Sequence, residues 1–336
     1  MLNYEFILND NVDITNRILT FTYSENIDDF ASSFSFEYLP DTLRNDLGIT
    51  SRINNRDVLN KIQIRERGQT DFFYTGYITD SEHTTDVNKY IYSGFDVGFY
   101  LNKNEVIIQF KNSNIGDAIQ TLCNEYQIPI RNANIPNFTQ SVSKIYKDVI
   151  FSDIIKELLR FERDKGGTRD IFVDCKNGIF NILQYTTNNA LSSVIANNIL
   201  VNSFDTISNV NIKHSIQELK NRVIYTDNNE KSLKRVFRES ADSIRTYGLL
   251  TNIETVDTKK TNNLDKLAQD KLNELNRVND TITLSMLGDF NLKKGVVIPL
   301  TINQYGLNGT YLIKKVTHTI DNQKEVVDLE IEERRI

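Results

Sequence analysis

A chain of 336 residues, 39% hydrophobic and 25% charged, has the composition of a folded protein with two or three domains. This composition excludes an intrinsically disordered chain. The longest unbroken apolar runs are a few residues, far short of the roughly 20 that span a bilayer, so we expect no membrane insertion. The N-terminus has neither a basic segment before its apolar residues nor a small-residue cleavage site, so we expect synthesis in the cytoplasm.

Charge is unevenly distributed within a net charge of −6. Residues 1–100 hold 16 acidic and 8 basic side chains, so the rest of the chain carries a small positive charge. A basic patch interleaved with aromatic residues, which is typical of nucleic-acid-binding proteins, is absent, and we expect no specific nucleic-acid binding. Solubility alone accounts for the acidic excess. The functional alternative is a surface that must not adhere to DNA.

The first 97 residues are rich in predicted strands. Hydrophobic residues alternate with polar ones in six segments, at residues 4–8, 19–23, 34–38, 62–64, 72–78 and 90–95. A period of two places the apolar set on one face of a strand. Because no sustained helical pattern interrupts these segments, residues 1–97 are predicted to form a small antiparallel β-barrel.

Residues 98–200 contain a faint internal repeat. Segments 110–123 and 146–159 align without gaps at an offset of 36 residues, and Asn112 matches Asp148. Apolar residues recur at helical spacing in both segments. Two copies fall short of the three that a solenoid needs. We therefore predict two small α+β modules, in each of which a helix covers a short sheet.

Residues 201–336 return to strands, with one long helix predicted at 262–277. Residues 281–320 alternate as a β-meander, and Asn308-Gly309 is typical of a type I′ hairpin turn. A last strand with alternating apolar residues follows at 327–331. We predict a second small barrel, with the helix packed on it. The predicted fold is thus a β-dominated α+β fold, with a tube-like barrel at each end and α+β modules between them.

Histidine and cysteine residues show no metal-binding pattern. His83, His214 and His318 are isolated from one another, outside any zinc-binding frame. We interpret His318 as a hydrogen-bonded structural residue. Cys123 and Cys175 are too few for a disulfide framework and are predicted to be buried free thiols. No metal site and no cofactor site is predicted.

Catalytic motifs are also missing from the sequence. The glycine-rich turn at 165–168 lacks phosphate-loop spacing, and no nucleophile elbow occurs. Carboxylates near the C-terminus invite comparison with the paired acids of glycosidases. However, Asp328, Glu330 and Glu332 alternate with apolar residues and fit a solvated strand face. We predict no catalytic residues and no enzymatic activity.

Four segments carry a resemblance to a known family, and it extends more loosely over nearly the whole chain. They are SIQELKNRVIY at 215–225, SIRTYGLL at 243–250, the run from Leu264 to Leu300, and LNGTYLIKKVTHTI at 307–320. Their order and spacing resemble those of baseplate hub proteins of contractile phage tails. The most similar hubs are those of Gram-positive myophages, phage-tail-like bacteriocins (tailocins) and defective prophages.

The resemblance implies a structural role in a contractile injection machine. Such hubs are homotrimers in which each chain gives two tube-like barrels, so that three chains form a pseudo-sixfold ring. The ring adapts a hexameric tail tube to a trimeric spike. Implied partners are the tube or tube-initiator protein, the central spike and the baseplate wedge proteins, with DNA able to pass through the lumen. The protein would be assembled, after synthesis in the bacterial host cytoplasm, into a virion or bacteriocin particle.

Three alternatives remain from the sequence alone. A tail-associated cell-wall hydrolase would lyse peptidoglycan, but the catalytic residues are missing. A glycan-binding β module would expose an aromatic cluster, whereas many aromatic residues alternate with polar ones as core residues do. A type VI-like spike-hub protein usually continues into a β-helical needle, and this sequence ends at Ile336. Under the hub interpretation, the functional surfaces are strand edges, the barrel face toward the lumen, and the helix at 262–277.

Overall fold

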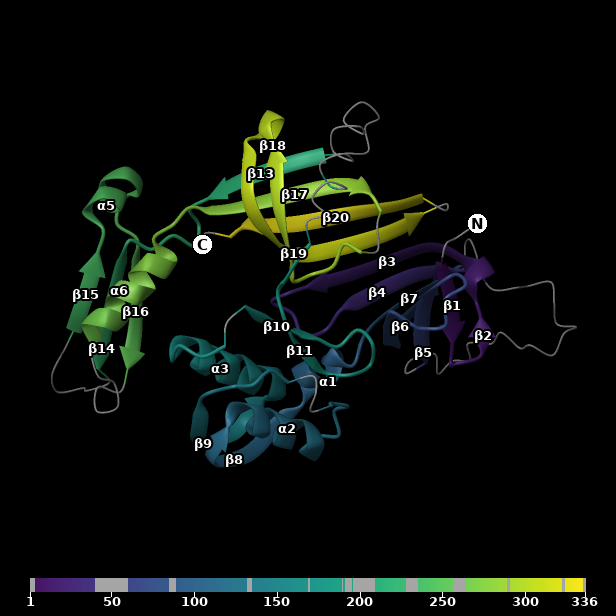
Figure 1. Ribbon diagram of the computed structural model, residues 1–336, viewed down its shortest axis with the longest axis horizontal. Helices are drawn as coiled ribbons and strands as arrows, with labels where there is room; N and C mark the ends of the chain where they lie inside the picture. Colours follow the sequence, from purple (N-terminus) through teal and green to yellow (C-terminus); the bar gives the residue numbers. More distant parts are fainter. Residues whose placement is uncertain are drawn as a thin grey trace, which may run out of the picture. The chain divides into compact units, whose positions relative to one another are not determined.

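The computed structural model divides into two compact units, one of residues 1–210 with 283–336 and one of residues 211–282. The structure describes residues 4–39, 60–84, 89–131, 135–168, 170–188, 190, 195, 209–227, 235–256, 264–288, 291–321 and 324–334. The first two residues of the helix predicted at 262–277 lie outside these ranges. Figure 1 shows the elements of both units.

One large sheet dominates the larger unit. Its strands are β1 (Tyr4–Leu8), β2 (Val12–Asp13), β3 (Ile18–Asn26), β4 (Ser33–Tyr38), β5 (Lys61–Glu66), β6 (Tyr74–Thr84), β7 (Lys89–Phe95), β12 (Thr186–Thr187), β17 (Asn279–Leu287), β18 (Val296–Ile302), β19 (Leu307–Asp321) and β20 (Lys324–Glu333). Short 3-10 turns lie at Thr15–Arg17 and Asn303–Tyr305. The strand order is β17-β20-β19-β3-β4-β7-β6-β5-β1-β2, with β13 (Asn209–Ser215) beside β17, β18 beside β19 and β12 beside β18. The β-dominated α+β class predicted from the sequence is confirmed.

The two ends of the chain meet in the middle of this sheet. Strand β3 pairs antiparallel with β19, with Thr22 opposite Thr319 and Tyr23 opposite His318. We call this pairing the seam. Two small tube-like barrels were predicted, one in each terminal segment, and this detail was wrong, because the described strands form one open sheet that runs through both segments. Alternating patterns define strand faces, but they do not say which strand edges pair.

The N-terminal half of the sheet curls around an aromatic core. Phe6 meets Phe21 with ring centroids 4.9 Å apart, and Tyr23 meets Tyr74 at the same distance. The largest fully buried side chains in the chain include many aromatic residues, as expected from their alternation with polar neighbours. Ile320 of β19 also belongs to this core, so the C-terminal segment completes the N-terminal core.

The predicted repeat is a pair of strand–helix units. Its elements are β8 (Glu105–Asn114) with α2 (Ile115–Glu125), and β9 (Ser141–Ile150) with α3 (Phe151–Asp164). Strands β8 and β9 pair antiparallel, and one apolar stripe of each helix is buried. Asn112 and Asp148, matched in the sequence alignment, both have positive φ, at 47° and 55°. Asn and Asp tolerate this left-handed backbone better than other side chains do.

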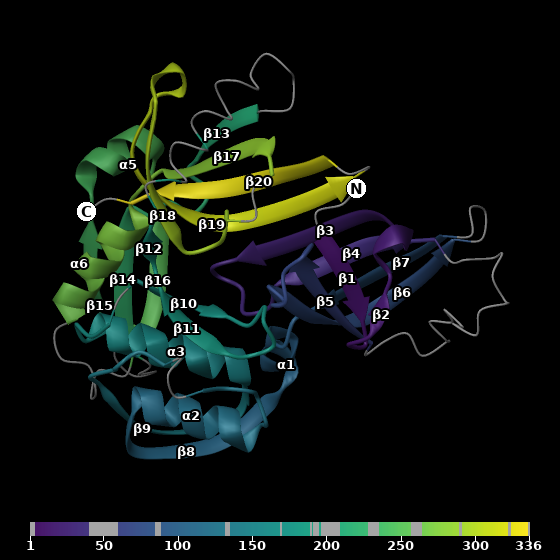
Figure 2. The same ribbon diagram turned by 45° about the vertical axis from the view of Figure 1, so that its right-hand side comes forward.

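Helix α1 (Gly98–Lys103) and the hairpin of β10 (Ile171–Asp174) and β11 (Asn181–Gln184) complete the larger unit. The hairpin lies between the large sheet and α3, as Figures 1 and 2 show. Cys123 and Cys175 lie in the core shared by these elements, and both are free and fully buried, as predicted.

Burial makes a simple prediction for the two thiols. It raises the pKa of Cys123 to about 12 and also raises the pKa of Cys175. Because the thiolate is the reactive form, neither should react with an aromatic disulfide reagent within minutes in the native protein. Both should react at once in denaturant. Rapid labelling of the native protein, followed by absorbance, would contradict this burial.

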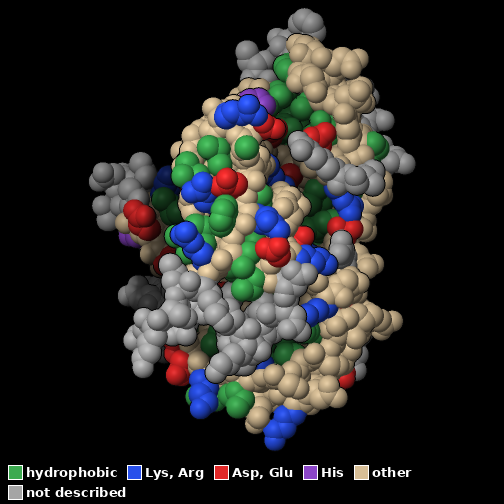
Figure 3. All heavy atoms as spheres, turned by 90° about the vertical axis from the view of Figure 1, so that its left-hand side faces the viewer, with side chains coloured by type: hydrophobic (Ala, Val, Ile, Leu, Met, Phe, Trp, Pro, Cys, Tyr) green, Lys and Arg blue, Asp and Glu red, His purple; other side chains and the backbone are tan. Residues whose placement is uncertain are grey.

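The smaller unit is a three-stranded sheet covered on one face by a helix. Its sheet has the order β15 (Arg235–Glu239), β14 (Arg222–Asp227), β16 (Thr251–Val256), and its helices are α5 (Ala241–Tyr247) and α6 (Leu264–Leu275). Ala268 and Leu272 of α6 are buried against Val223 and Tyr225 of β14. The predicted helix therefore forms, but it packs on this small sheet and not on a barrel. On the side of the chain seen in Figure 3, hydrophobic side chains lie exposed among Lys and Arg side chains.

Candidate functional site: the polar face of the sheet

One face of the large sheet is lined by small hydroxyl side chains. Residues of the opposite parity are buried in β3, β4, β17 and β19. The polar set consists of Thr20, Thr22, Ser24, Ser33, Ser35, Ser93, Thr281, Thr283, Ser285, Thr317 and Thr319, all partly exposed. Because side chains alternate across a strand, the polar alternation seen in the sequence becomes one continuous face. We call it the polar face.

Hydroxyl groups meet across the strands of the polar face. Ser24 Oγ lies 3.0 Å from Thr317 Oγ1 across the seam. Thr22 has Thr319 opposite it on one side and Ser35 on the other. Hydroxyl pairs of this kind stabilise cross-strand contacts by a few tenths of a kcal/mol to about 1 kcal/mol each. The face is therefore hydrated but mostly uncharged near the seam.

Charged side chains on this face are largely paired. Lys89 Nζ lies 2.7 Å from Glu37 Oε1, and Lys315 lies directly opposite Glu330. Asp80 faces Ser93 across β6 and β7. Other acidic residues of the N-terminal segment, such as Asp10, lie in turns. The acidic excess predicted for residues 1–100 therefore falls only partly on the polar face.

Behind the seam, on the buried side of the sheet, lies a cluster of charged groups. Glu25 of β3 is 1% exposed. Its carboxylate accepts hydrogen bonds from Tyr23 Oη at 2.8 Å, Lys176 Nζ at 3.2 Å and the backbone N–H of Lys294 at 2.7 Å. Burial would raise the pKa of Glu25, but the two lysines and the hydrogen bonds lower it to about 2. A charged Glu25 thus joins the sheet, the loop after β10 and the loop before β18.

Two further buried carboxyl groups lie close to this cluster. Burial raises the pKa of Asp96 to about 7, although the backbone N–H groups of Ser32 and Gly98 donate to it and oppose the shift. Burial also raises the pKa of Asp174, against the nearby lysines. Ionisable groups this deeply buried stay charged only when they are paired. We therefore interpret the cluster as a structural contact that holds the sheet and the two loops together.

The predicted structural histidine is confirmed as hydrogen-bonded. His318 is 1% exposed, with Nδ1 3.0 Å from Glu325 Oε1 and Nε2 3.2 Å from the carbonyl oxygen of Leu292. His83 stacks on Tyr90 with centroids 4.2 Å apart, and the exposed His214 lies 2.7 Å from Asp280. The structure brings none of the three histidines together.

Among the described residues, no group of three or more His, Cys, Asp or Glu side chains could hold a metal ion. Within the same ranges, no helix combines the length and apolar character needed to cross a membrane. The predicted lack of catalytic, metal and cofactor sites stays a prediction.

A cleft lies beside the cluster, lined by α3, β10 and the turn after β3. At one rim of this cleft, Glu162 of α3 holds the neighbouring loops in place. Its fully buried carboxylate accepts hydrogen bonds from the backbone N–H groups of Thr139, Gln140 and Thr168 at 2.9 to 3.0 Å. Burial opposes the charge, but these hydrogen bonds hold the pKa of Glu162 below its usual range.

The Glu162→Gln variant should lose about 1–3 kcal/mol of unfolding free energy, because its amide nitrogen cannot accept an N–H. The folded-state pKa of Glu162 is lowered, so its contribution exists above the unfolded pKa of about 4.3 and is lost as pH falls below it. Urea unfolding at pH 7 and pH 3.5 should therefore show a smaller difference between variant and wild type at the lower pH. A difference that grows on acidification would contradict this role.

The chain matches one family model over most of its length. The model of the YQBQ-like family matches residues 21–332, which is nearly the whole chain. The chain belongs to the YQBQ-like family. A search of curated proteins finds no match to this YQBQ-like chain.

Solved structures share the fold of this YQBQ-like protein. The 43 kDa tail protein of prophage MuSo2 from Shewanella oneidensis aligns with a TM-score of 0.71 at 11% identity, covering 98% of both chains. A tail protein of Neisseria meningitidis MC58 aligns at 0.66 and 12% identity, covering 98% of this chain and 97% of that one. Prophage tail protein gp18 from Listeria monocytogenes aligns at 0.51 and 11% identity, covering 98% and 95%. The resemblance predicted from the sequence is confirmed in family and fold.

The buried cluster was missed in the sequence, although one signal was present. Glu25 continues the alternation of Phe21 and Tyr23, and so occupies a core position of β3. A carboxylate at such a position requires a buried partner. Lys176 and Lys294 lie far away in the sequence, and nothing local marks them as those partners.

Proposed function

We propose that this YQBQ-like protein is a structural component of a phage-tail-like baseplate, acting as a hub. In this role three copies form a ring between a hexameric tail tube and a trimeric spike. The observation that carries the proposal is the seam, which joins both ends of the chain in one sheet with one polar face. Tail proteins from two bacteria, one of them encoded by a prophage, share the fold over nearly their whole length.

The width of one part of the sheet fits a ring of three. Seven adjacent strands, from β17 through β19 and β3 to β6, span about 34 Å at a spacing of about 4.8 Å, with β13 beyond one end of this arc and β5, β1 and β2 beyond the other. Three such arcs close into a circle about 32 Å across at the level of the backbone. An opening of this size exceeds the 10–12 Å diameter of a single α-helix. The polar face would then line the lumen, and its sparse net charge would let a polymer pass without adhering.

Ring closure also protects the ends of the sheet. An open sheet presents unpaired N–H and C=O groups at its edges, which favour pairing with another chain. A head-to-tail arrangement of identical chains closes when the rotation between copies is a simple fraction of a turn. In a trimer each edge would be covered by the next copy. Partners above and below would be the tube or tube-initiator protein and the spike, with wedge proteins around the ring.

The test is the mass of the purified protein in solution, alone and mixed with candidate spike and tube proteins. A trimer would have about three times the mass of the 38.8 kDa chain, with a central opening in negative-stain images. A monomer that binds neither the spike nor the tube protein would overturn the proposal. Lysis of peptidoglycan by the purified chain would favour the hydrolase alternative instead.

A further inference from the structure

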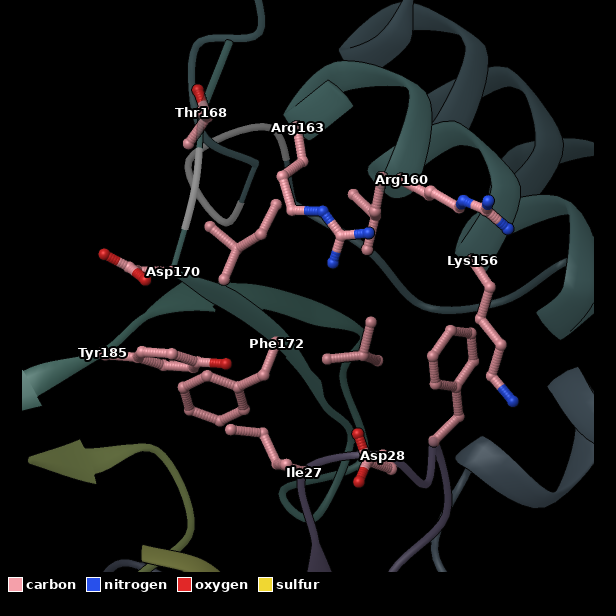
Figure 4. A pocket seen from close by; sticks show the side chains of 13 residues that line it. Ile27, Asp28, Lys156, Arg160, Arg163, Thr168, Asp170, Phe172 and Tyr185 are labelled. Carbon is pink, nitrogen blue, oxygen red and sulfur yellow. The ribbon is translucent and has the colours of Figure 1, made fainter. Parts of the chain in front are cut away.

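The cleft beside the buried cluster has the size of a binding site. Its volume is about 560 Å³, and its lining comes from the turn after β3, from α3, and from the β10–β11 hairpin with the residues that follow it. Ligand pockets in proteins commonly measure about 300–1,000 Å³. Figure 4 shows Arg163 reaching down into the cleft, while the ring of Tyr185 points its hydroxyl inward.

One wall of the cleft carries three cations on a single helix face. Lys156, Arg160 and Arg163 line it from α3, at positions i, i+4 and i+7. Arg160 and Arg163 share one carboxylate, that of Asp164, at 3.4 and 3.3 Å, and all three of these side chains are more than half exposed. Such exposed ion pairs contribute little stability and are readily exchanged. In Figure 4 Arg163 reaches into the cleft while Arg160 is directed along α3 away from it, so an extended anionic chain can meet the two guanidinium groups in turn.

Carboxylates on the other rim already have cationic partners in the C-terminal segment. Asp28 pairs with Lys314 of β19 at 3.3 Å, and the same lysine lies 3.1 Å from Glu332. Asp170 pairs with Arg334, whose guanidinium also lies 5.6 Å from the centre of the Tyr185 ring. In Figure 4 the side chain of Asp170 points away from the cleft. The positive charge of α3 is thus left without an equal negative charge within the cleft.

The floor of the cleft is aromatic. Phe172 and Tyr185 lie with ring centroids 5.9 Å apart, and Phe30 carries Lys156 Nζ 5.4 Å from its ring centre. Aromatic rings offer large apolar contact with little loss of side-chain freedom. An occupant should therefore combine carboxylates for the arginines with an apolar side chain for the floor.

We propose that this cleft binds an extended acidic peptide segment of a partner protein, with carboxylates on Arg160 and Arg163 and an apolar side chain on Phe172 and Tyr185. The planar guanidinium groups suit bidentate pairing with carboxylates. A nucleic acid fits less well, because its backbone needs a continuous basic track, whereas the cations that line this cleft come from one face of α3. The proposal rests on the cleft alone and does not require the trimeric ring.

The experiment uses the purified full-length chain and a fluorescein-labelled peptide of sequence Glu-Glu-Phe-Glu-Leu-Glu. Fluorescence anisotropy should show saturable binding with a Kd below about 1 mM. Combining Arg160→Ala with Arg163→Ala should weaken it at least tenfold, whereas Lys165→Ala should match wild type. Lys165 is the matched control because it follows α3, lies over Phe161 and does not line the cleft.

A peptide with Gln in place of Glu should bind at least tenfold more weakly. Thermal melting checks that each variant is folded. We expect all of them to fold, because the substituted side chains are exposed. The inference is overturned if the acidic peptide does not reach half-saturation by about 1 mM, or if the double variant binds it as wild type does. It is also overturned if a single-stranded oligonucleotide binds more tightly than the peptide. None of these binding measurements depends on the oligomeric state of the protein. They therefore test the cleft independently of the hub proposal.

Discussion

Replacing Glu25 by Ala should lower the free energy of unfolding by about 3–5 kcal/mol, among the largest effects of any single substitution in this chain. The carboxylate is 1% exposed and serves both Lys176 and Lys294. Without it, two ammonium groups remain in the interior with no counter-charge. For a unit of this size the melting temperature should fall by roughly 10 °C, measured by differential scanning calorimetry.

A matched control is the partly exposed pair of Glu5 and Arg65, 2.7 Å apart on the same sheet. Glu5→Ala should cost less than about 1 kcal/mol. Rescue gives a sharper test, because replacing a buried ion group by apolar residues is often neutral. Combining Glu25→Leu with Lys176→Met and Lys294→Met should regain part of the loss, and only part because buried Asp174 then loses the same two lysines. A single Glu25 variant that melts within 2 °C of wild type would show that the lysines relax into water.

The effect of Glu25 should depend on pH in a defined direction. Its pKa is lowered to about 2 in the folded protein, against about 4.3 for an unperturbed glutamate. A lowered folded-state pKa gives stability that is present above the unfolded pKa and is lost as pH falls toward the folded one. The difference between wild type and Glu25→Ala should therefore be constant above pH 5 and shrink between pH 4 and pH 2.

Ile320→Ala should destabilise the N-terminal core, 300 residues away in the sequence, by about 2–5 kcal/mol. Ile320 lies on β19 but is buried among aromatic residues of β1 to β7. Near-ultraviolet circular dichroism, which reports aromatic packing, should weaken together with stability in urea. Lys315→Ala, an exposed position of the same strand, should leave both signals unchanged.

The same seam predicts the behaviour of a fragment. Residues 1–97 made alone should fail to form a stable fold, because β3 loses its pairing with β19 and the core loses Ile320. Protease resistance and dispersed amide resonances would show the opposite, a self-sufficient module as predicted from the sequence. A stable fragment together with a neutral Ile320→Ala would contradict the structural role of the seam.

Local patterns were enough to predict most elements. The alternation of Phe34 and Phe36, or of Thr317 and Thr319, is visible in the sequence and gives both the strand and its faces. Helical spacing likewise predicted α2, α3 and α6. The repeat match between Asn112 and Asp148 even marked two positions of equal backbone conformation.

Long-range pairing could not be predicted in the same way. Which strand pairs with β3 depends on strand edges and register. No residue of β3 indicates that its partner is β19. The cleft joins side chains from the turn at Asp28, from α3 and from Tyr185. None of these carries a motif, and their meeting depends on how the hairpin of β10 and β11 packs between α3 and the sheet.

Because of the seam, β3 remains without its partner strand β19 for much of translation. About 280 residues separate the end of β3 at Asn26 from the start of β19 at Leu307. At roughly 5–20 residues per second, the ribosome needs about 15–60 seconds to deliver the missing strand. Throughout that time one edge of β3 has no partner from its own chain and can pair with a neighbouring nascent copy. The yield of correctly folded protein in the host should therefore depend on how well a chaperone shields that edge until β19 has been synthesised.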